Sequence, residues 1–268
     1  MARRPEIEAV AILAAVLVTA PAAVSAPAGE ETRPPSASCA GVEAEAVLAL
    51  FEGRPDEPVR GFRARRRMHA EGLGREAFME VLVELDPEGD LRWTVTSEGG
   101  SELIRKKAFR GMLEKEAELR RTERPEGTAL TAQNYELAVN GREGDGLVRL
   151  RAVPRRTEAG LLDGSFVVTS ETADLVRVEG RLVRNPSFWV TRVDVVRHYR
   201  RIRGHRVVVR IESVSRIRLF GPVRLTVDFD YEMIESDEVG PSEALPSSTF
   251  MARTAGPPGG EVQPRPDR

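Results

Sequence analysis

Three carboxylates recur at alternate positions near the end of the last long apolar segment: Asp228, Asp230 and Glu232. Alternate residues of a β-strand point to the same face, so these side chains come close enough to share a cation. A strand offers only a row of oxygens, however, whereas hard cations prefer a loop that encloses them. We therefore expect a solvated strand face with arginines opposite it, and no metal site.

No other residues form a recognisable catalytic signature. The chain lacks a Gly-x-Ser-x-Gly elbow, a His-Glu-x-x-His pair, a P-loop and a dinucleotide fingerprint. Three glycines lie between two short predicted strands with no helix after them, which indicates a hairpin turn and not a phosphate cradle: Gly141, Gly144 and Gly146. His198 and His205 lack the carboxylate or thiol that would complete a metal site. We expect neither a cofactor nor an enzymatic activity.

Arginines gather around one predicted hairpin tip: Arg197, Arg200, Arg201, Arg203, Arg206 and Arg210. The simpler interpretation is a solvated strand face balanced by nearby carboxylates. The other is contact with lipid headgroups or an acidic partner. The formal net charge of -2 gives the whole chain no attraction to nucleic acid, so we expect no nucleic-acid partner.

The N-terminus is typical of an export signal. Residues 1–8 carry two arginines, residues 9–24 form an apolar run without a charge, and small residues follow. The run is close to the minimum for a bilayer span and is interrupted by Pro21, which favours cleavage over anchoring. Cleavage after Ala28 avoids leaving Pro27 at the new N-terminus. Residues 1–28 are thus predicted to be a signal peptide, and the mature protein is predicted to be periplasmic.

The single cysteine, Cys39, excludes an internal disulfide, so the apolar core must hold the fold. A bacterial lipoprotein cysteine directly follows the apolar run, whereas Cys39 follows a stretch rich in proline and serine. We interpret it as an unpaired thiol near the N-terminus.

Composition divides the rest of the chain into three parts. Residues 29–41 are a predicted disordered leader, and residues 236–268 are a predicted disordered tail with few apolar side chains. Between them, residues 42–235 contain no repeat and no linker rich in Pro and Gly, so we expect one domain there.

Alternation of apolar and polar residues predicts a train of strands in this domain. After a short helix over 42–51, strands are expected at 62–70, 79–85, 91–97, 135–139, 147–153, 166–170, 175–182, 187–202, 206–219 and 223–234. The last two should pair as a hairpin through Gly221 and Pro222.

One longer helix interrupts the strands. Ser101 is a candidate N-cap for a helix that runs to Arg121, in which Ile104, Ala108 and Met112 share an apolar stripe. That stripe must lie against the sheet. We predict a mainly β (α+β) fold, in which a curved antiparallel sheet or open half-barrel of about ten strands wraps around this helix. A membrane barrel is disfavoured because one face of the strands is charged and aromatic content is only 5%.

The order of these elements, with Asn134-Tyr135, the segment Pro186-Ser187-Phe188-Trp189-Val190 and a terminal long hairpin, resembles the LolA/LolB-like superfamily of periplasmic lipoprotein carriers and sorting proteins. The resemblance spans residues 42–234. It implies an open half-barrel folded over helices, with acyl chains held in the hollow between them.

These observations leave three functions open. The first is a carrier or chaperone that binds acyl chains or lipoproteins in the concave face; the second is a periplasmic sensor or interaction domain for a protein partner; the third is an exported enzyme without local motifs. The carrier is the favoured hypothesis, because the predicted fold forms a hollow and the sequence contains no recognisable reactive site. We expect a monomer with peripheral membrane contact, and a cavity lined by Trp93, Ile104, Ala108, Met112, Phe166, Trp189, Phe229 and Tyr231.

Overall fold

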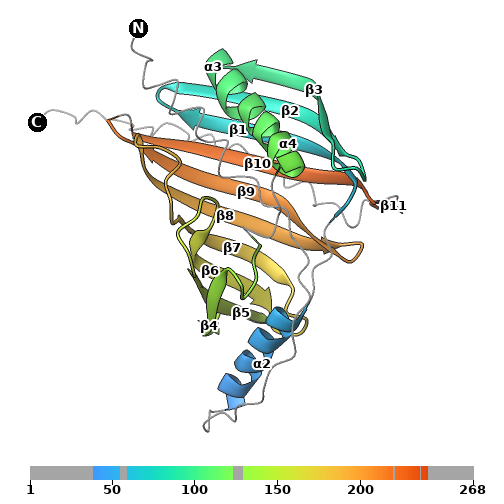
Figure 1. Ribbon diagram of the computed structural model, residues 1–268, viewed down its shortest axis with the longest axis vertical. Helices are drawn as coiled ribbons and strands as arrows, with labels where there is room; N and C mark the ends of the chain where they lie inside the picture. Colours follow the sequence, from blue (N-terminus) through green and yellow to red (C-terminus); the bar gives the residue numbers. More distant parts are fainter. Residues whose placement is uncertain (1–38, 55–58, 123–128, 220, 236, 241–268) are drawn as a thin grey trace, which may run out of the picture.

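The computed structural model describes residues 39–54, 59–122, 129–219, 221–235 and 237–240. The predicted signal peptide (1–28), residues 29–38 of the predicted leader and residues 241–268 of the predicted tail lie outside this part. Within it, eleven strands form one antiparallel sheet that curves around a helix (Figure 1). The predicted fold class is confirmed.

Each of the ten predicted strand segments forms a strand. They are β1 (Phe62–Gly72), β2 (Arg75–Leu85), β3 (Leu91–Gly100), β4 (Tyr135–Arg142), β5 (Leu147–Pro154), β6 (Leu162–Thr169), β7 (Leu175–Leu182), β8 (Val190–Ile202), β9 (His205–Ile217) and β10 (Gly221–Ile234). A short eleventh strand, β11 (Asp237–Glu238), pairs with the end of β10 inside the predicted tail. Most hairpins are tight, as the turn residues between the apolar segments predict.

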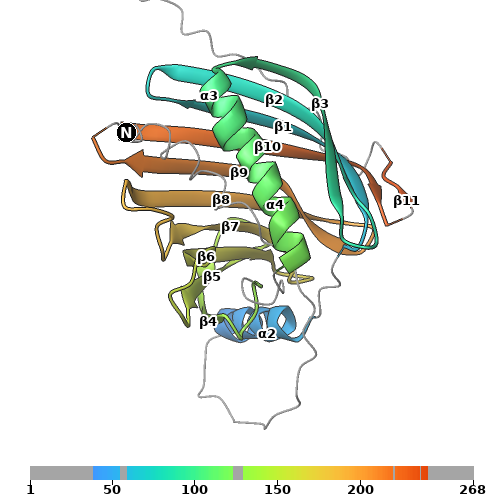
Figure 2. The same ribbon diagram turned by 45° about the horizontal axis from the view of Figure 1, so that its top comes forward.

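The strand order explains why a long helix is needed. The order is β3-β2-β1-β10-β9-β8-β7-β6-β5-β4. The first strand, β1, is therefore not an edge strand, and it pairs with the last long strand, β10. The chain reaches one edge at β3 and resumes at the opposite edge with β4. The segment between these two edges must therefore cross the sheet, and Figure 2 shows its helix running diagonally over the concave face from the β2–β3 edge towards the other half of the sheet.

This crossing helix consists of α3 (Glu102–Ile104), a π-helical stretch η2 (Arg105–Arg110) and α4 (Gly111–Thr122), without a break between them. A separate helix, α2 (Cys39–Gly53), packs against β4 and β5 and starts before the expected residue 42. Ser101 occupies the N-cap position, but its side chain makes no capping hydrogen bond, contrary to expectation. Its amide instead donates to the Glu76 carbonyl at 2.8 Å, which ties the helix start to β2.

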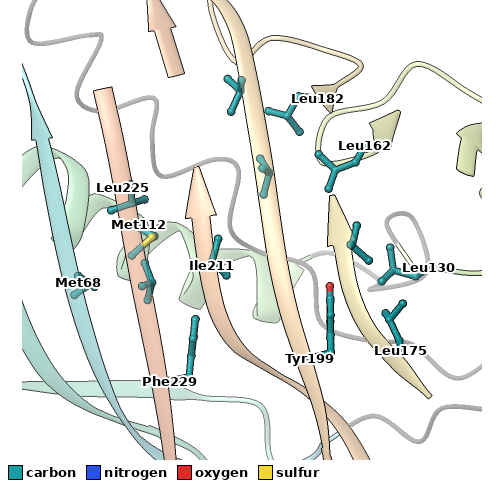
Figure 3. Packing of buried hydrophobic residues seen from close by; sticks show 14 of the residues in the cluster. Met68, Met112, Leu130, Leu162, Leu175, Leu182, Tyr199, Ile211, Leu225 and Phe229 are labelled. Carbon is teal, nitrogen blue, oxygen red and sulfur yellow. The ribbon is translucent and has the colours of Figure 1, made fainter. Parts of the chain in front are cut away.

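The strands bury one face and expose the other, as their alternation predicts. In β9 the buried side chains occupy every second position: Val207, Val209, Ile211, Ser213, Ser215 and Ile217. β8 and β10 alternate in the same way. Figure 3 shows part of the resulting core, in which Met112 of the helix and Leu225 of β10 belong to one cluster.

A pair of glycines allows the close approach of β6 and β7. Gly164 and Gly180 are register partners. A Cβ atom on Gly164 would lie 2.0 Å from the Glu179 carbonyl oxygen, and one on Gly180 would lie 2.6 Å from the Asp163 carbonyl oxygen. Only glycine fits at both positions, because backbone atoms occupy the space that a side chain needs.

The terminal hairpin forms as predicted, but its turn lies elsewhere. Gly221 and Pro222 already belong to β10, where they pair with Ile217 and Arg216. The chain reverses between Ile217 and Gly221, where Leu219 adopts a φ of 72°. The expected turn residues were therefore wrong, because the bend uses a left-handed leucine and not the proline.

The predicted start of β8 at residue 187 was also wrong. The Ser187 hydroxyl accepts a hydrogen bond from the Trp189 amide and its carbonyl accepts one from the Val190 amide, each at 3.2 Å. This local turn competes with the extended conformation, so the strand begins only at Val190.

Candidate functional site

The candidate site is the interior between the crossing helix and the concave face of the sheet. The helix turns one continuous apolar side inward: Ile104, Ala108, Phe109, Met112, Leu113 and Ala117 are all buried. The π-helical stretch widens the turn around Ala108 and Phe109. Such single wide turns are common at functional sites, where they re-aim side chains.

Charged residues fix the start of this helix to the edge of the sheet. Glu98 at the end of β3 binds Arg105 at 2.6 Å and Arg110 at 2.8 Å. The hydrogen bond from Arg110 and the charges of both arginines outweigh desolvation, so the pKa of Glu98 lies below its usual value.

A buried ion pair joins the helix to β1, the third strand from the β3 edge. Arg66 of β1 donates from Nη1 to Oε2 of Glu116 at 2.5 Å and from Nη2 to Oε1 at 3.1 Å. The two side chains are only 4% and 10% exposed. Arg120 approaches the same carboxylate at 3.3 Å. Burial disfavours the charge on Glu116, but the attraction and hydrogen bonds of Arg66 and Arg120 outweigh it and lower the pKa to about 2.

Aromatic rings enclose this ion pair. The guanidinium of Arg66 lies 4.9 Å from the centre of the Phe229 ring and 5.8 Å from that of Phe62. Tyr231 contacts Phe62 edge to face at 5.7 Å and donates its hydroxyl to the Val208 carbonyl at 3.2 Å. Burial raises the pKa of Tyr231 to about 12. A cation surrounded by ring faces keeps favourable electrostatic contacts where water is excluded.

A second buried arginine lies in the other half of the interior. Arg197 of β8 is 1% exposed and follows Val193 and Val195 on the buried face. Burial raises the pKa of Tyr199 and of Tyr135, and the positive charge of Arg197 opposes both shifts. The interior therefore combines an apolar wall with cationic and phenolic groups.

The arginine cluster predicted at the β8–β9 hairpin divides between the two faces. Arg197 points inward, which contradicts the expectation of a solvated side chain, because its position shares the parity of the core residues. Burial lowers the pKa of Arg206 to about 10, and its guanidinium lies 5.9 Å from the Phe51 ring. Arg201 binds Asp174 at 2.5 Å, and Arg210 binds Asp228 at 2.9 Å.

The predicted cavity residues fall into four places. Ile104, Ala108 and Met112 lie on the buried side of the helix. Figure 3 shows Met112 together with Phe229 of β10 in the core. Tyr231 and the half-buried Trp93 pack at the margin of the core. Phe166 lies farther along the sheet on β6, with its ring 5.0 Å from Tyr135. Trp189 lies in the β7–β8 loop and belongs to neither core cluster of described residues.

The row of carboxylates on β10 faces arginines of both neighbouring strands. Arg210 binds Asp228, Arg65 is the register partner of Asp230, and Arg65 binds Glu232 at 3.3 Å. The described part of the chain contains no group of three or more His, Cys, Asp or Glu side chains placed to hold a metal ion. This row is thus an ion-paired strand face.

The interior charges were not identified from the sequence, although a signal for two of them exists. Arg66 alternates with Ala64 and Met68, and Arg197 alternates with Val195 and Tyr199. An arginine on the apolar parity of a strand must be buried with a partner, must reach water at the edge, or must bind a ligand. The sequence does not name the partner Glu116, which lies on a different element.

Two open hollows lie away from this interior. One, of about 690 Å³, is on the polar face of β5 to β9 and is lined by charged side chains that include Arg151, Asp163, Arg192 and Asp194. The other, of about 390 Å³, lies between α2 and β5, with Val47, Leu50 and Val148 in its wall. In the first, the lining arginines and carboxylates pair with one another.

Within the described residues, no helix has the length and apolar character needed to cross a membrane. A scan of known protein families and a search of curated proteins both return no match.

Two solved structures resemble the chain. A LolA superfamily protein from Nitrosomonas europaea is 9% identical, with 74% of this chain and 94% of that chain covered and a TM-score of 0.34. A DUF1329 family protein from Desulfovibrio piger is 10% identical, with 72% and 92% covered and a TM-score of 0.32. The predicted likeness to the LolA superfamily is thus found at the level of the fold.

Proposed function

We propose that this protein is a periplasmic carrier that holds an acyl chain of a lipid or lipoprotein between the crossing helix and the concave face of the sheet. The observation that carries the proposal is that, besides α2 at the β4–β5 end, the apolar face of the sheet is covered by the crossing helix. This helix takes no part in the strand ladder. Its separation from the sheet would break no ladder hydrogen bonds, so the sheet could stay intact while a ligand replaced the helix contacts.

An acyl chain is the ligand that such a surface favours. The inner wall is formed by valine, leucine and phenylalanine side chains, and apolar surface gains about 25 cal/mol per Å² on leaving water. With the helix in place these side chains are buried. A ligand must therefore displace helix contacts such as those of Met112, whose flexible thioether adapts easily to a new neighbour.

The polar interior groups suit a lipid headgroup or the polar end of an acyl ligand. Arg197 places a buried guanidinium next to Tyr199, and Arg66, whose charge Glu116 balances, lies near Tyr231. Guanidinium groups pair strongly with carboxylate and phosphate oxygens. The predicted signal peptide supports a role outside the cytoplasm.

Displacement of a fluorescent fatty acid by unlabelled fatty acids of increasing chain length tests the proposal. We expect displacement to strengthen with length, and a ligand at a hundred times its Kd should raise the stability by about 2.7 kcal/mol. Ala108→Phe should fill the interior and weaken binding, whereas Lys107→Phe, at an exposed helix position, should leave it unchanged. Far-UV circular dichroism checks that both variants are folded.

Native mass spectrometry of gently extracted protein gives an independent result. A co-purifying acyl species supports the carrier. If no chain length displaces the probe or shifts the melting temperature, the carrier proposal fails. A stable complex with another protein would then favour the interaction domain.

A further inference from the structure

The β7–β8 loop and the β9–β10 turn lie at the same end of the sheet (Figures 1 and 2). They carry exposed apolar side chains, Phe188 and Leu219. The Arg218 amide donates to the Trp189 carbonyl at 2.8 Å, which holds the two connections together. The Phe188 ring contacts the Trp189 ring edge to face at 5.7 Å. The Arg218 guanidinium lies 4.6 Å from the centre of the Phe188 ring. We refer to Phe188, Trp189, Arg218 and Leu219 as the aromatic tip.

The aromatic tip carries the two most exposed large apolar side chains of the described residues. Leu219 is 89% exposed and Phe188 is 72% exposed, whereas the other large apolar side chains on the surface do not exceed 46%. Leu219 also adopts a φ of 72°, a conformation that glycine or asparagine takes with less strain. The turn alone therefore does not explain a leucine at this position.

The surroundings of the aromatic tip are positively charged. Residues 183–193 and 213–227 contain five arginines and neither aspartate nor glutamate. In the part of the chain that the structure describes, Arg184, Arg216 and Arg218 form no ion pair with a carboxylate. Arg192 and Arg216 are register partners on adjacent strands, and Asp194 binds Arg192 but leaves the charge of Arg216 unbalanced. An anion outside the chain would pair with Arg216.

We propose that the aromatic tip docks on the surface of an anionic lipid bilayer. Aromatic rings have an apolar body that suits the headgroup boundary, where the indole N–H can still meet water or lipid oxygens. Leu219 enters the same layer, and Arg184, Arg216 and Arg218 meet the lipid phosphates. An acidic protein would satisfy the arginines equally well, but a bilayer also accepts a solvent-facing leucine and phenylalanine without a shaped pocket. This surface is separate from the interior, so it stands whether or not the interior binds an acyl chain.

Fluorescence quenching by brominated lipids tests this contact directly. The chain has two tryptophans, so Trp93→Phe leaves Trp189 as the single emitter, and Trp189→Phe leaves Trp93. In vesicles of phosphatidylcholine and phosphatidylglycerol, we expect brominated acyl chains to quench Trp189 and to leave Trp93 nearly unchanged. The N-terminal apolar run is the same in every variant, so a difference in quenching between Trp189 and Trp93 reports on the aromatic tip and not on that run. Equal quenching of both tryptophans, or none of Trp189, overturns the proposal.

Vesicle sedimentation provides the second measurement. Phe188→Ser with Leu219→Ser should weaken partitioning by about tenfold or more. The matched control, Leu50→Ser with Phe78→Ser, changes two other surface residues that are each 46% exposed and should have little effect. Arg216→Gln with Arg218→Gln should weaken partitioning to anionic vesicles on the order of thirtyfold, and added salt should reduce the difference.

The charge control is Arg63→Gln with Arg92→Gln, two exposed arginines on β1 and β3 that pair with carboxylates. If tip and control variants sediment alike with anionic vesicles, the bilayer is not the partner of this surface. Loss of vesicle binding by the tip variants with unchanged acyl-probe displacement separates this proposal from the carrier proposal.

Discussion

Arg66 and Glu116 form a two-point ion pair inside the protein and join β1 to the helix that crosses the sheet. The Nη1–Oε2 distance is 2.5 Å and the Nη2–Oε1 distance is 3.1 Å. Charges this deeply buried are costly unless each has its partner. The position of the helix on the sheet therefore depends on two residues that lie 50 positions apart in the chain.

Removal of one partner should be strongly destabilising. Glu116→Gln leaves the Arg66 guanidinium buried without its carboxylate, and we expect the free energy of unfolding to fall by about 3–5 kcal/mol. Urea denaturation measures this loss. As a matched control, Lys115→Gln removes a surface pair with Glu118 on the same helix and should cost less than about 1 kcal/mol. Equal losses in the two variants would show that the buried pair contributes no more to the free energy of unfolding than the surface pair does.

Stability should decrease in acid because of the same pair. The pKa of Glu116 is about 2 in the folded protein, below its ordinary value of 4.5. The carboxylate therefore stabilises the fold above about pH 4.5, and this contribution is lost as the pH falls from there through about 2. The urea midpoint between pH 6 and pH 2 should fall less steeply in Glu116→Gln than in the unaltered protein. Parallel profiles would contradict the assignment.

A charge on the apolar side of the helix should unfold the protein. Met112 is 3% exposed, and Met112→Asp buries a carboxylate without a partner, so a loss of several kcal/mol is expected. Lys107→Asp places the same carboxylate on the exposed side and should change the melting temperature little. Circular dichroism during heating compares them. An unchanged melting temperature in Met112→Asp would mean that the helix is peripheral.

The backbones of β6 and β7 lie too close together at Gly164 to leave space for a side chain. Gly164→Ala places a Cβ atom 2.0 Å from the Glu179 carbonyl oxygen, so the strands must separate and stability should fall by more than about 2 kcal/mol. Gly111→Ala is the matched control, because a Cβ atom there meets nothing within 4 Å. It should raise stability by up to about 1 kcal/mol, since alanine favours a helix. If Gly164→Ala melts like the unaltered protein, the two strands do not meet this closely in solution.

Local patterns in the sequence were sufficient to predict the elements and their buried faces. Val207, Val209 and Ile211 alternate with polar residues, and alternation alone assigns them to one face, because successive side chains of a strand point to opposite sides. The helical stripe of Ile104, Ala108 and Met112 follows in the same way from the helical repeat. These periodicities depend only on neighbouring residues, so the ten strands and the crossing helix could be predicted without knowledge of the fold.

The tertiary structure alone decided which strands are neighbours and what lies inside. Backbone hydrogen-bonding groups are the same in every strand, so nothing local to β1 indicates that Phe62 pairs with Ile234. The helix crosses the sheet because β3 and β4 are opposite edges, which only the strand order reveals. Arg66 is buried rather than solvated because Glu116 reaches it from that helix. A buried charge depends on its partner, and the partner is brought close only when the chain has folded.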